Sequence, residues 1–103
     1  MGADGRWAAY QALVDRVVRG PGTATVQQRE AAFANDDMDA ALQPLIGKVV
    51  TEPTRITDAD FDHARAAGFT EDQLFEVVIA AAVGQSSRMY ASALAALDEA
   101  VAG

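Results

Sequence analysis

The chain has 103 residues, half of them hydrophobic, with 8 basic against 15 acidic side chains and a formal net charge of −7. This length predicts a single domain over residues 1–103. The absence of cysteine excludes disulfides, thiolate metal sites and thiol nucleophiles. The acidic excess argues against nucleic acid and anionic membranes as partners, because both bind basic surfaces.

No segment indicates a membrane span or an export signal. The longest apolar run, Val77–Val83, is too short to cross a bilayer. The stretch Met1–Arg6 has no apolar signal core. We therefore expect a cytoplasmic protein.

The first predicted element is a helix over about residues 4–19. Its apolar residues recur at helical spacing and would form one face: Trp7, Tyr10, Val14 and Val17 or Val18. Gly20-Pro21-Gly22 ends it. Residues 1–22 are thus predicted to be an N-terminal helix and linker.

A short second helix should follow, starting with a capping box of Thr25 and Gln28 and ending near Asn35. Asp36-Asp37 is then expected to cap a turn over residues 38–42.

A third helix is predicted with Pro44 at its first position, where a missing N–H costs nothing. It carries the apolar residues Leu45, Ile46, Val49 and Val50, and Pro53 closes it.

Two further helix starts give the clearest local signal. Thr57 with Asp60, and Thr70 with Gln73, have capping-box spacing, each flanked by apolar residues in hydrophobic-staple positions. Gly68 between them suits a left-handed helix end. The pattern predicts a helix over about 58–67 and a tight corner into a last helix running to about Ala100. A bend is expected near Gly84 and Ser86-Ser87.

This last helix predicts self-association. From Leu74 to Val83 its apolar residues cover nearly every direction around the axis, with only a narrow face left to Gln73 and Glu76. Four short helices cannot enclose it fully, and soluble monomers seldom expose large apolar patches. We therefore expect a dimer or higher assembly, with residues 75–90 in the contact.

Candidate site residues are few. His63, the only histidine, lies one turn after Asp60, where a carboxylate neighbour could make it a general base. Arg88 follows the most apolar stretch and could hold a carboxylate, as could Arg55 and Arg65.

Glu76 is the only charged residue between Leu74 and Gly84, and it could pair with Arg88 or Lys48. The alternative for all these side chains is an ordinary structural or surface role. No phosphate loop, nucleophile elbow or metal-binding motif is present, so no cofactor and no metal is expected.

The second half of the chain resembles a known family. The segments Ile56–Phe61 and Ala66–Ala82, with their alanine-glycine corner, capping threonine and long apolar helix, are similar to the carboxymuconolactone decarboxylase-like and alkylhydroperoxidase-D-like proteins. The continuations Val83–Arg88 and Ala93–Leu97 resemble small members without cysteine. The resemblance implies an all-α fold of five or six helices, a helical core over residues 56–100, and an oligomer.

The redox members of that family carry a Cys-x-x-Cys-x-x-x-His motif. Its distance from Gly68 places it over Pro53, Ile56 and Asp60, none of which is a thiol or a histidine. Peroxidase chemistry therefore does not carry over to this chain.

Two functions remain open at this point. The preferred hypothesis is a non-redox, oligomeric binding or accessory subunit with a protein partner. The alternative is a lyase or isomerase acting on a small carboxylate through His63 and an arginine.

Overall fold

In a computed structural model, which describes residues 2–102, the chain folds into five α-helices with one short 3₁₀ turn and no strand in that range. The elements are α1 (Gly2–Arg19), α2 (Val26–Ala34), α3 (Gln43–Thr51), η1 (Pro53–Arg55), α4 (Asp58–Ala66) and α5 (Glu71–Ala102). The all-helical prediction is confirmed.

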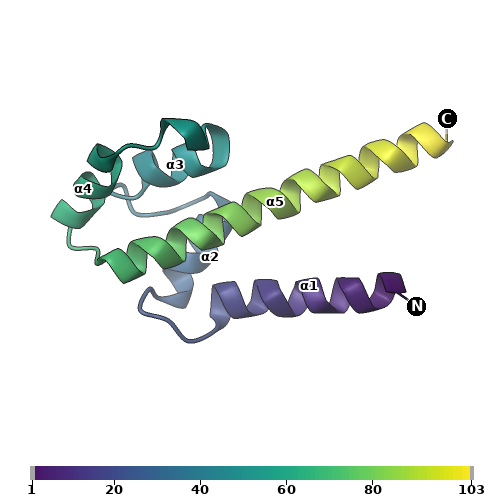
Figure 1. The fold of residues 1–103 in the computed structure, drawn as a ribbon, viewed down its shortest axis with the longest axis horizontal. Coiled ribbons are helices and arrows are strands. Elements are labelled where there is room, and N and C mark those ends of the chain that lie inside the picture. The colour runs from purple at the N-terminus through teal and green to yellow at the C-terminus, as the bar shows by residue number, and fades with distance from the viewer. Residues whose placement is uncertain (1, 103) are drawn as a thin grey trace.

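The arrangement is built around α5, a single long helix that spans the molecule from end to end (Figure 1). Its first half packs mainly against α2, with α3 and α4 beside it. Helix α1 runs antiparallel to α5 and diverges from it towards the end where both termini lie (Figure 1).

The core lies at one end of the molecule. Its largest fully buried side chains are Leu42, Leu45, Ile46, Leu74 and Val77, and small residues such as Ala32, Ala64, Ala80 and Ala81 fill the spaces between them. Alanine at these positions lets α5 approach α2 and α4 closely. The core therefore draws on α2, α3, α4 and the first half of α5.

The predicted capping signals are confirmed. The Gln28 N–H donates to the Thr25 hydroxyl (3.0 Å) and the Thr25 N–H to the Gln28 side chain (2.9 Å). Thr70 and Gln73 repeat this pair of bonds at the start of α5. The Thr57 N–H donates to the Asp60 carboxylate at the start of α4.

Gly68 has a positive φ of 105°, as predicted. The Phe69 N–H donates to the carbonyl of Ala64 and the Gly68 N–H to that of Arg65, which is the Schellman pattern. This motif turns the chain from α4 into α5.

Some predicted boundaries were wrong. Helix α1 begins at Gly2, and α3 begins at Gln43, so Pro44 is its second residue. In the turn before α3 the capping carboxylate is Asp39, which accepts from the Ala41 N–H (2.9 Å), rather than Asp36 or Asp37.

The expected bend in the last helix is absent, and α5 continues without interruption to Ala102. Gly84 is buried against α2 instead of marking a break. Its missing side chain allows α5 to pack closely against the Phe33 backbone of α2. No helix within residues 2–102 is long and apolar enough to cross a membrane.

Candidate functional site

Glu76 fixes the loop between α1 and α2. Its carboxylate accepts bonds from the Thr23 N–H (2.9 and 3.0 Å), from the Thr23 hydroxyl and from the Ala24 N–H (3.4 Å). Burial raises the pKa of Glu76, but these bonds and the nearby Arg29 outweigh it and the pKa is lowered overall. Of the alternatives open for Glu76, the structure shows a structural role, with bonds to Thr23 and Ala24 instead of a pair with Arg88 or Lys48.

Arg88 is also occupied by the fold. One guanidinium nitrogen, Nη1, donates to the backbone carbonyl of Phe33 (2.6 Å), and Nε and Nη2 reach the Gln85 side chain (3.3 and 3.2 Å). Phe33 lies in the last turn of α2, where carbonyls lack helical partners. Arg88 therefore satisfies the end of α2.

The other predicted basic residues lie on α4 and η1. His63 is exposed on α4. Arg65 pairs with Asp62 (2.9 Å) and Glu71 (3.2 Å), and Arg55 pairs with Glu52 (3.7 Å) on the surface.

The predicted candidates on α5 also lie too far apart to share a ligand. Glu76 and Arg88 are twelve residues apart on this helix, which corresponds to about 18 Å along its axis. The described contacts thus join none of His63, Glu76 and Arg88 in one site.

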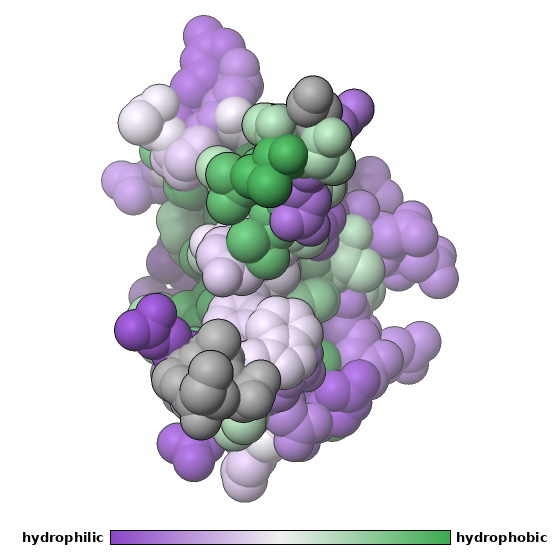
Figure 2. All heavy atoms as spheres, turned by 90° about the vertical axis from the view of Figure 1, so that its right-hand side faces the viewer, coloured by the Kyte–Doolittle hydropathy of each residue, from purple (hydrophilic) through white to green (hydrophobic). Residues whose placement is uncertain are grey.

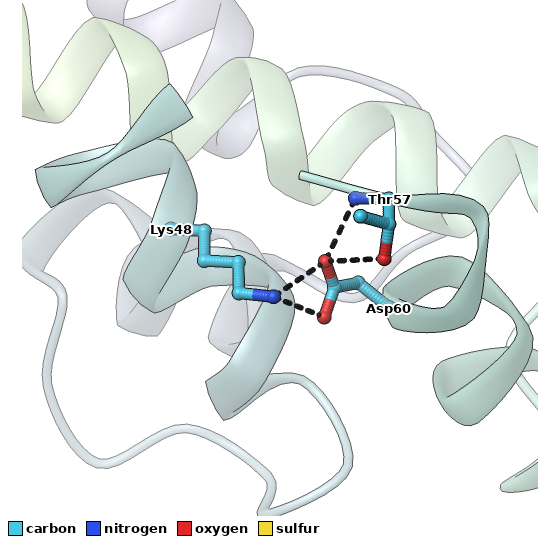
Figure 3. A network of polar contacts seen from close by, with 3 residues as sticks. All are labelled: Lys48, Thr57 and Asp60. Carbon is cyan, nitrogen blue, oxygen red and sulfur yellow. Dashed lines mark hydrogen bonds and ion pairs between the residues drawn. The ribbon is translucent and has the colours of Figure 1, made fainter. Parts of the chain in front are cut away.

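A partly buried ion pair connects α3 with α4, in which the Lys48 side chain is 35% and the Asp60 side chain 9% exposed. Lys48 Nζ lies 2.9 and 3.0 Å from the two Asp60 carboxylate oxygens, and Thr57 contributes its N–H and hydroxyl (Figure 3). The bond from the Thr57 backbone and the Lys48 ammonium lower the pKa of Asp60. The Lys48 and Thr57 donors all bond to Asp60, so the network stabilises the junction of α3 and α4 rather than forming a site.

Sequence reasoning missed Arg29. Its side chain is only 4% exposed, its Nη1 donates to the Val17 carbonyl (3.3 Å), and its Nε has no partner. Nothing in the local sequence marks an arginine of α2 as buried. Within residues 2–102 no three carboxylate or imidazole side chains gather to hold a metal ion.

The remaining candidate is a cleft between α1 and α5 near the diverging end. It has a volume of about 450 Å³ and is lined by Arg6, Trp7, Tyr10, Ser86 and Tyr90. We call it the aromatic cleft. Two of its rings, Trp7 and Tyr10, stack with centroids 6.0 Å apart and an interplanar angle of 29°.

A hydroxyl chain fixes the inner edge of this cleft. The Ser87 hydroxyl donates to the Val83 carbonyl (2.9 Å), so its lone pair is free to accept the Tyr10 hydroxyl, with which it is in contact. Tyr10 comes from the predicted apolar face of α1, but no sequence signal pointed to Ser87 as its partner.

From the cleft onwards, α5 projects as an arm over residues 89–102, all of which are exposed, and Tyr90 belongs to both. Its large apolar side chains are 42–80% exposed: Met89, Tyr90, Leu94, Leu97 and Val101. Figure 2, viewed from the diverging end, shows hydrophobic atoms gathered on the α5 side and pale atoms of intermediate hydropathy below them. We call residues 89–102 the α5 arm.

Comparison with protein-family models, with curated proteins and with solved structures found no match for this chain.

Proposed function

We propose that this chain is a subunit of a homo-oligomer, and that two copies pair through their α5 arms. Its role would be that of a non-redox binding or accessory protein, as the resemblance to the carboxymuconolactone decarboxylase-like and alkylhydroperoxidase-D-like proteins suggests. The observation that carries the proposal is the uncharged stretch 89–97 of the arm, every residue of which is exposed.

The composition of the arm supports a buried environment. The stretch 89–97, Met-Tyr-Ala-Ser-Ala-Leu-Ala-Ala-Leu, makes two and a half helical turns without one charged residue, although 22% of the chain is charged. A helix that is uncharged in every direction is normally covered in every direction. Inside this chain nothing covers it, since every residue of the arm is exposed.

The spacing of the large residues fits a helical partner. Ser87, Tyr90, Leu94, Leu97 and Val101 follow one another at intervals of three and four residues, which is the repeat of a coiled-coil seam. Between them stand alanines at 91, 93, 95, 96 and 100, which let a second helix come close. The neighbouring helix, α1, carries the same 3–4 repeat at Trp7, Tyr10, Val14 and Val17.

The surface area is consistent with a missing partner. The isolated chain exposes 6820 Å², whereas a globular monomer of its 10.8 kDa mass exposes about 5,500 Å². Its radius of gyration is 15.6 Å, against about 13 Å for a compact domain of this length. The excess area exceeds the roughly 800 Å² that each partner buries in an ordinary stable interface.

A second copy suits this surface better than a strongly charged partner. With a net charge of −7, two copies repel over most of their surface, and an uncharged segment is where that repulsion is smallest. A two-fold contact between identical arms is the commonest closed solution.

The experiment is sedimentation equilibrium on the wild type and on two variants. Leu94→Asp combined with Leu97→Asp places charges on the seam and should give monomers with an unchanged helical circular-dichroism spectrum. The matched control is Val26→Asp, which changes an exposed apolar residue at the start of α2, away from the arm. Equal masses for the wild type and the arm variant would refute the proposed contact.

A further inference from the structure

The aromatic cleft has the size of a small-molecule site. Its volume of about 450 Å³ falls within the range of ordinary ligand pockets and is enough for a ligand of one or two rings. Its walls come from different helices, with Arg6, Trp7 and Tyr10 on α1 and Ser86 and Tyr90 on α5. All the lining residues belong to one chain, so the cleft is complete without a second copy.

Aromatic side chains dominate these walls. Trp7 is 56% and Tyr90 57% exposed, so both rings present open faces or edges towards solvent. Tyr10 is half-buried and held by Ser87, which gives the cleft a fixed inner edge. Flat rings on both walls favour a flat, aromatic ligand body, which stacks with more energy than its area alone provides.

The charge of the cleft determines whether it favours an anionic or a cationic ligand. An aromatic cluster by itself would attract a cation over the ring faces. Among the side chains that the structure describes, Arg6 is the one charged lining residue, and it has no ion-pair partner there. A guanidinium at this place disfavours a cation and offers paired N–H donors to a carboxylate.

A second cleft differs from the aromatic cleft in the charge of its lining. Between α4 and α5 lies a cleft of about 350 Å³ with Phe61, Phe75 and Arg65 in its wall. There the guanidinium of Arg65 already pairs with Asp62 and Glu71, and Asp72 adds further negative charge to the lining. The aromatic cleft is therefore the better place for an anion.

We propose that the aromatic cleft binds a planar aromatic carboxylate. The ring system would lie against Trp7 and Tyr90, and the carboxylate would meet Arg6, with the Ser86 hydroxyl as a further donor. This goes beyond the proposed self-association, because it names a ligand class and a site within each copy.

Trp7 makes the test direct, because it is the only tryptophan of the chain. Its emission, and its indole N–H signal in NMR, report on this cleft alone. Three probes are used. Naphthoate carries both the aromatic ring and the charge, naphthamide carries the ring alone, and cyclohexanecarboxylate carries the charge alone. Naphthoate should bind saturably and about tenfold more tightly than either of the others, as expected for one charge-assisted contact or one stacked ring.

Variants separate the contributions. Arg6→Gln should bring naphthoate affinity down to that of naphthamide, and Tyr90→Ala should weaken both. Arg16→Gln removes a positive charge from the same helix away from the cleft and should leave all three affinities unchanged.

The monomeric arm variant Leu94→Asp/Leu97→Asp is titrated beside the wild type, because a bound partner could shield the cleft. Saturable, Arg6-dependent binding in either protein supports the ligand proposal whatever the mass measurements give. Absence of saturable binding in both proteins, or equal affinity for naphthoate and naphthamide, would overturn it.

Discussion

Gly84 of α5 lies directly against the backbone carbonyl of Phe33 in α2, so closely that a Cβ at position 84 would overlap the oxygen. One turn further along α5, Arg88 donates to the same carbonyl oxygen at 2.6 Å. Contact between α2 and α5 thus depends on two features at the Phe33 carbonyl. These are the absence of a side chain at Gly84 and the long side chain of Arg88. This contact sets the position from which α5 projects towards the diverging end.

The Gly84 contact predicts an unusual effect of alanine. In an open helix, Gly→Ala stabilises the fold, but Gly84→Ala must push α5 away from α2 and should cost about 1–3 kcal/mol. Gly47 in α3 has open space where its Cβ would stand, so Gly47→Ala should stabilise by about 0.5–1 kcal/mol. Urea unfolding of both variants measures this, and a stabilising Gly84→Ala would contradict the packing.

The corner between α4 and α5 predicts a second pair of effects. Gly68 has φ 105°, a conformation that a β-branched residue adopts only with strain, so Gly68→Val should cost about 1 kcal/mol or more. Ala67, the preceding residue, has an ordinary φ of −83°, and Ala67→Val should change the free energy of unfolding far less. Losses of only a few tenths of a kcal/mol at position 68 would show that the Schellman corner is misplaced.

Acid should unfold the protein through Asp60 and Glu76. Both carboxylates have pKa values lowered in the fold below the ordinary 3.8 and 4.5, so the unfolded chain binds more protons in acid. Their contribution to stability is present above the unfolded-chain pKa values of 3.8 and 4.5, and it is lost as the pH falls below these values and through the lower pKa values of the folded protein. Urea midpoints measured from neutral pH downwards should follow this course.

Two variants assign the acid sensitivity. Asp60→Asn removes the partner of Lys48, so it should lower stability at neutral pH and flatten the acid limb of the curve. Asp36→Asn, in the exposed loop after α2, should leave the curve unchanged. An acid limb of equal steepness in the Asp60 variant would rule out this residue as a source.

The sequence excludes thiol-dependent reduction of peroxides as an activity of this protein. With no cysteine in the chain, reduction of a hydroperoxide by a thiolate is impossible. Purified protein supplied with peroxide and a dithiol reductant should show no turnover above buffer. Turnover that survives repeated purification would demand a mechanism that the sequence does not contain.

The parts of the fold that sequence predicts are those set by near neighbours. The boxes at Thr25, Thr57 and Thr70 each join residues three apart, and the Gly68 corner depends on six consecutive residues. Such local bonds leave a recognisable spacing in the sequence, which is why these helix starts and the corner were predicted correctly.

The contacts that hold the candidate side chains in place span long separations. Glu76 holds a loop 53 residues away, Arg88 reaches Phe33 across 55, and Tyr10 meets Ser87 across 77. Two of these contacts have a backbone group as one partner. Because the backbone is nearly the same for every residue, the sequence does not reveal such contacts. The self-association contact expected over residues 75–90 stays a prediction. Leu74, Val77, Ala80, Ala81 and Gly84 are buried within the chain, and the stretch of α5 in which every residue is exposed lies further along, in the α5 arm.

The mass of the wild-type protein in solution tests the central claim most directly. Static light scattering coupled to size exclusion, at micromolar concentration and neutral pH, gives this mass independently of shape. Pairing through the α5 arms predicts a mass of at least twice 10.8 kDa that falls towards the monomer on dilution or in the Leu94→Asp/Leu97→Asp variant. A mass of 10.8 kDa throughout the micromolar range would contradict the account.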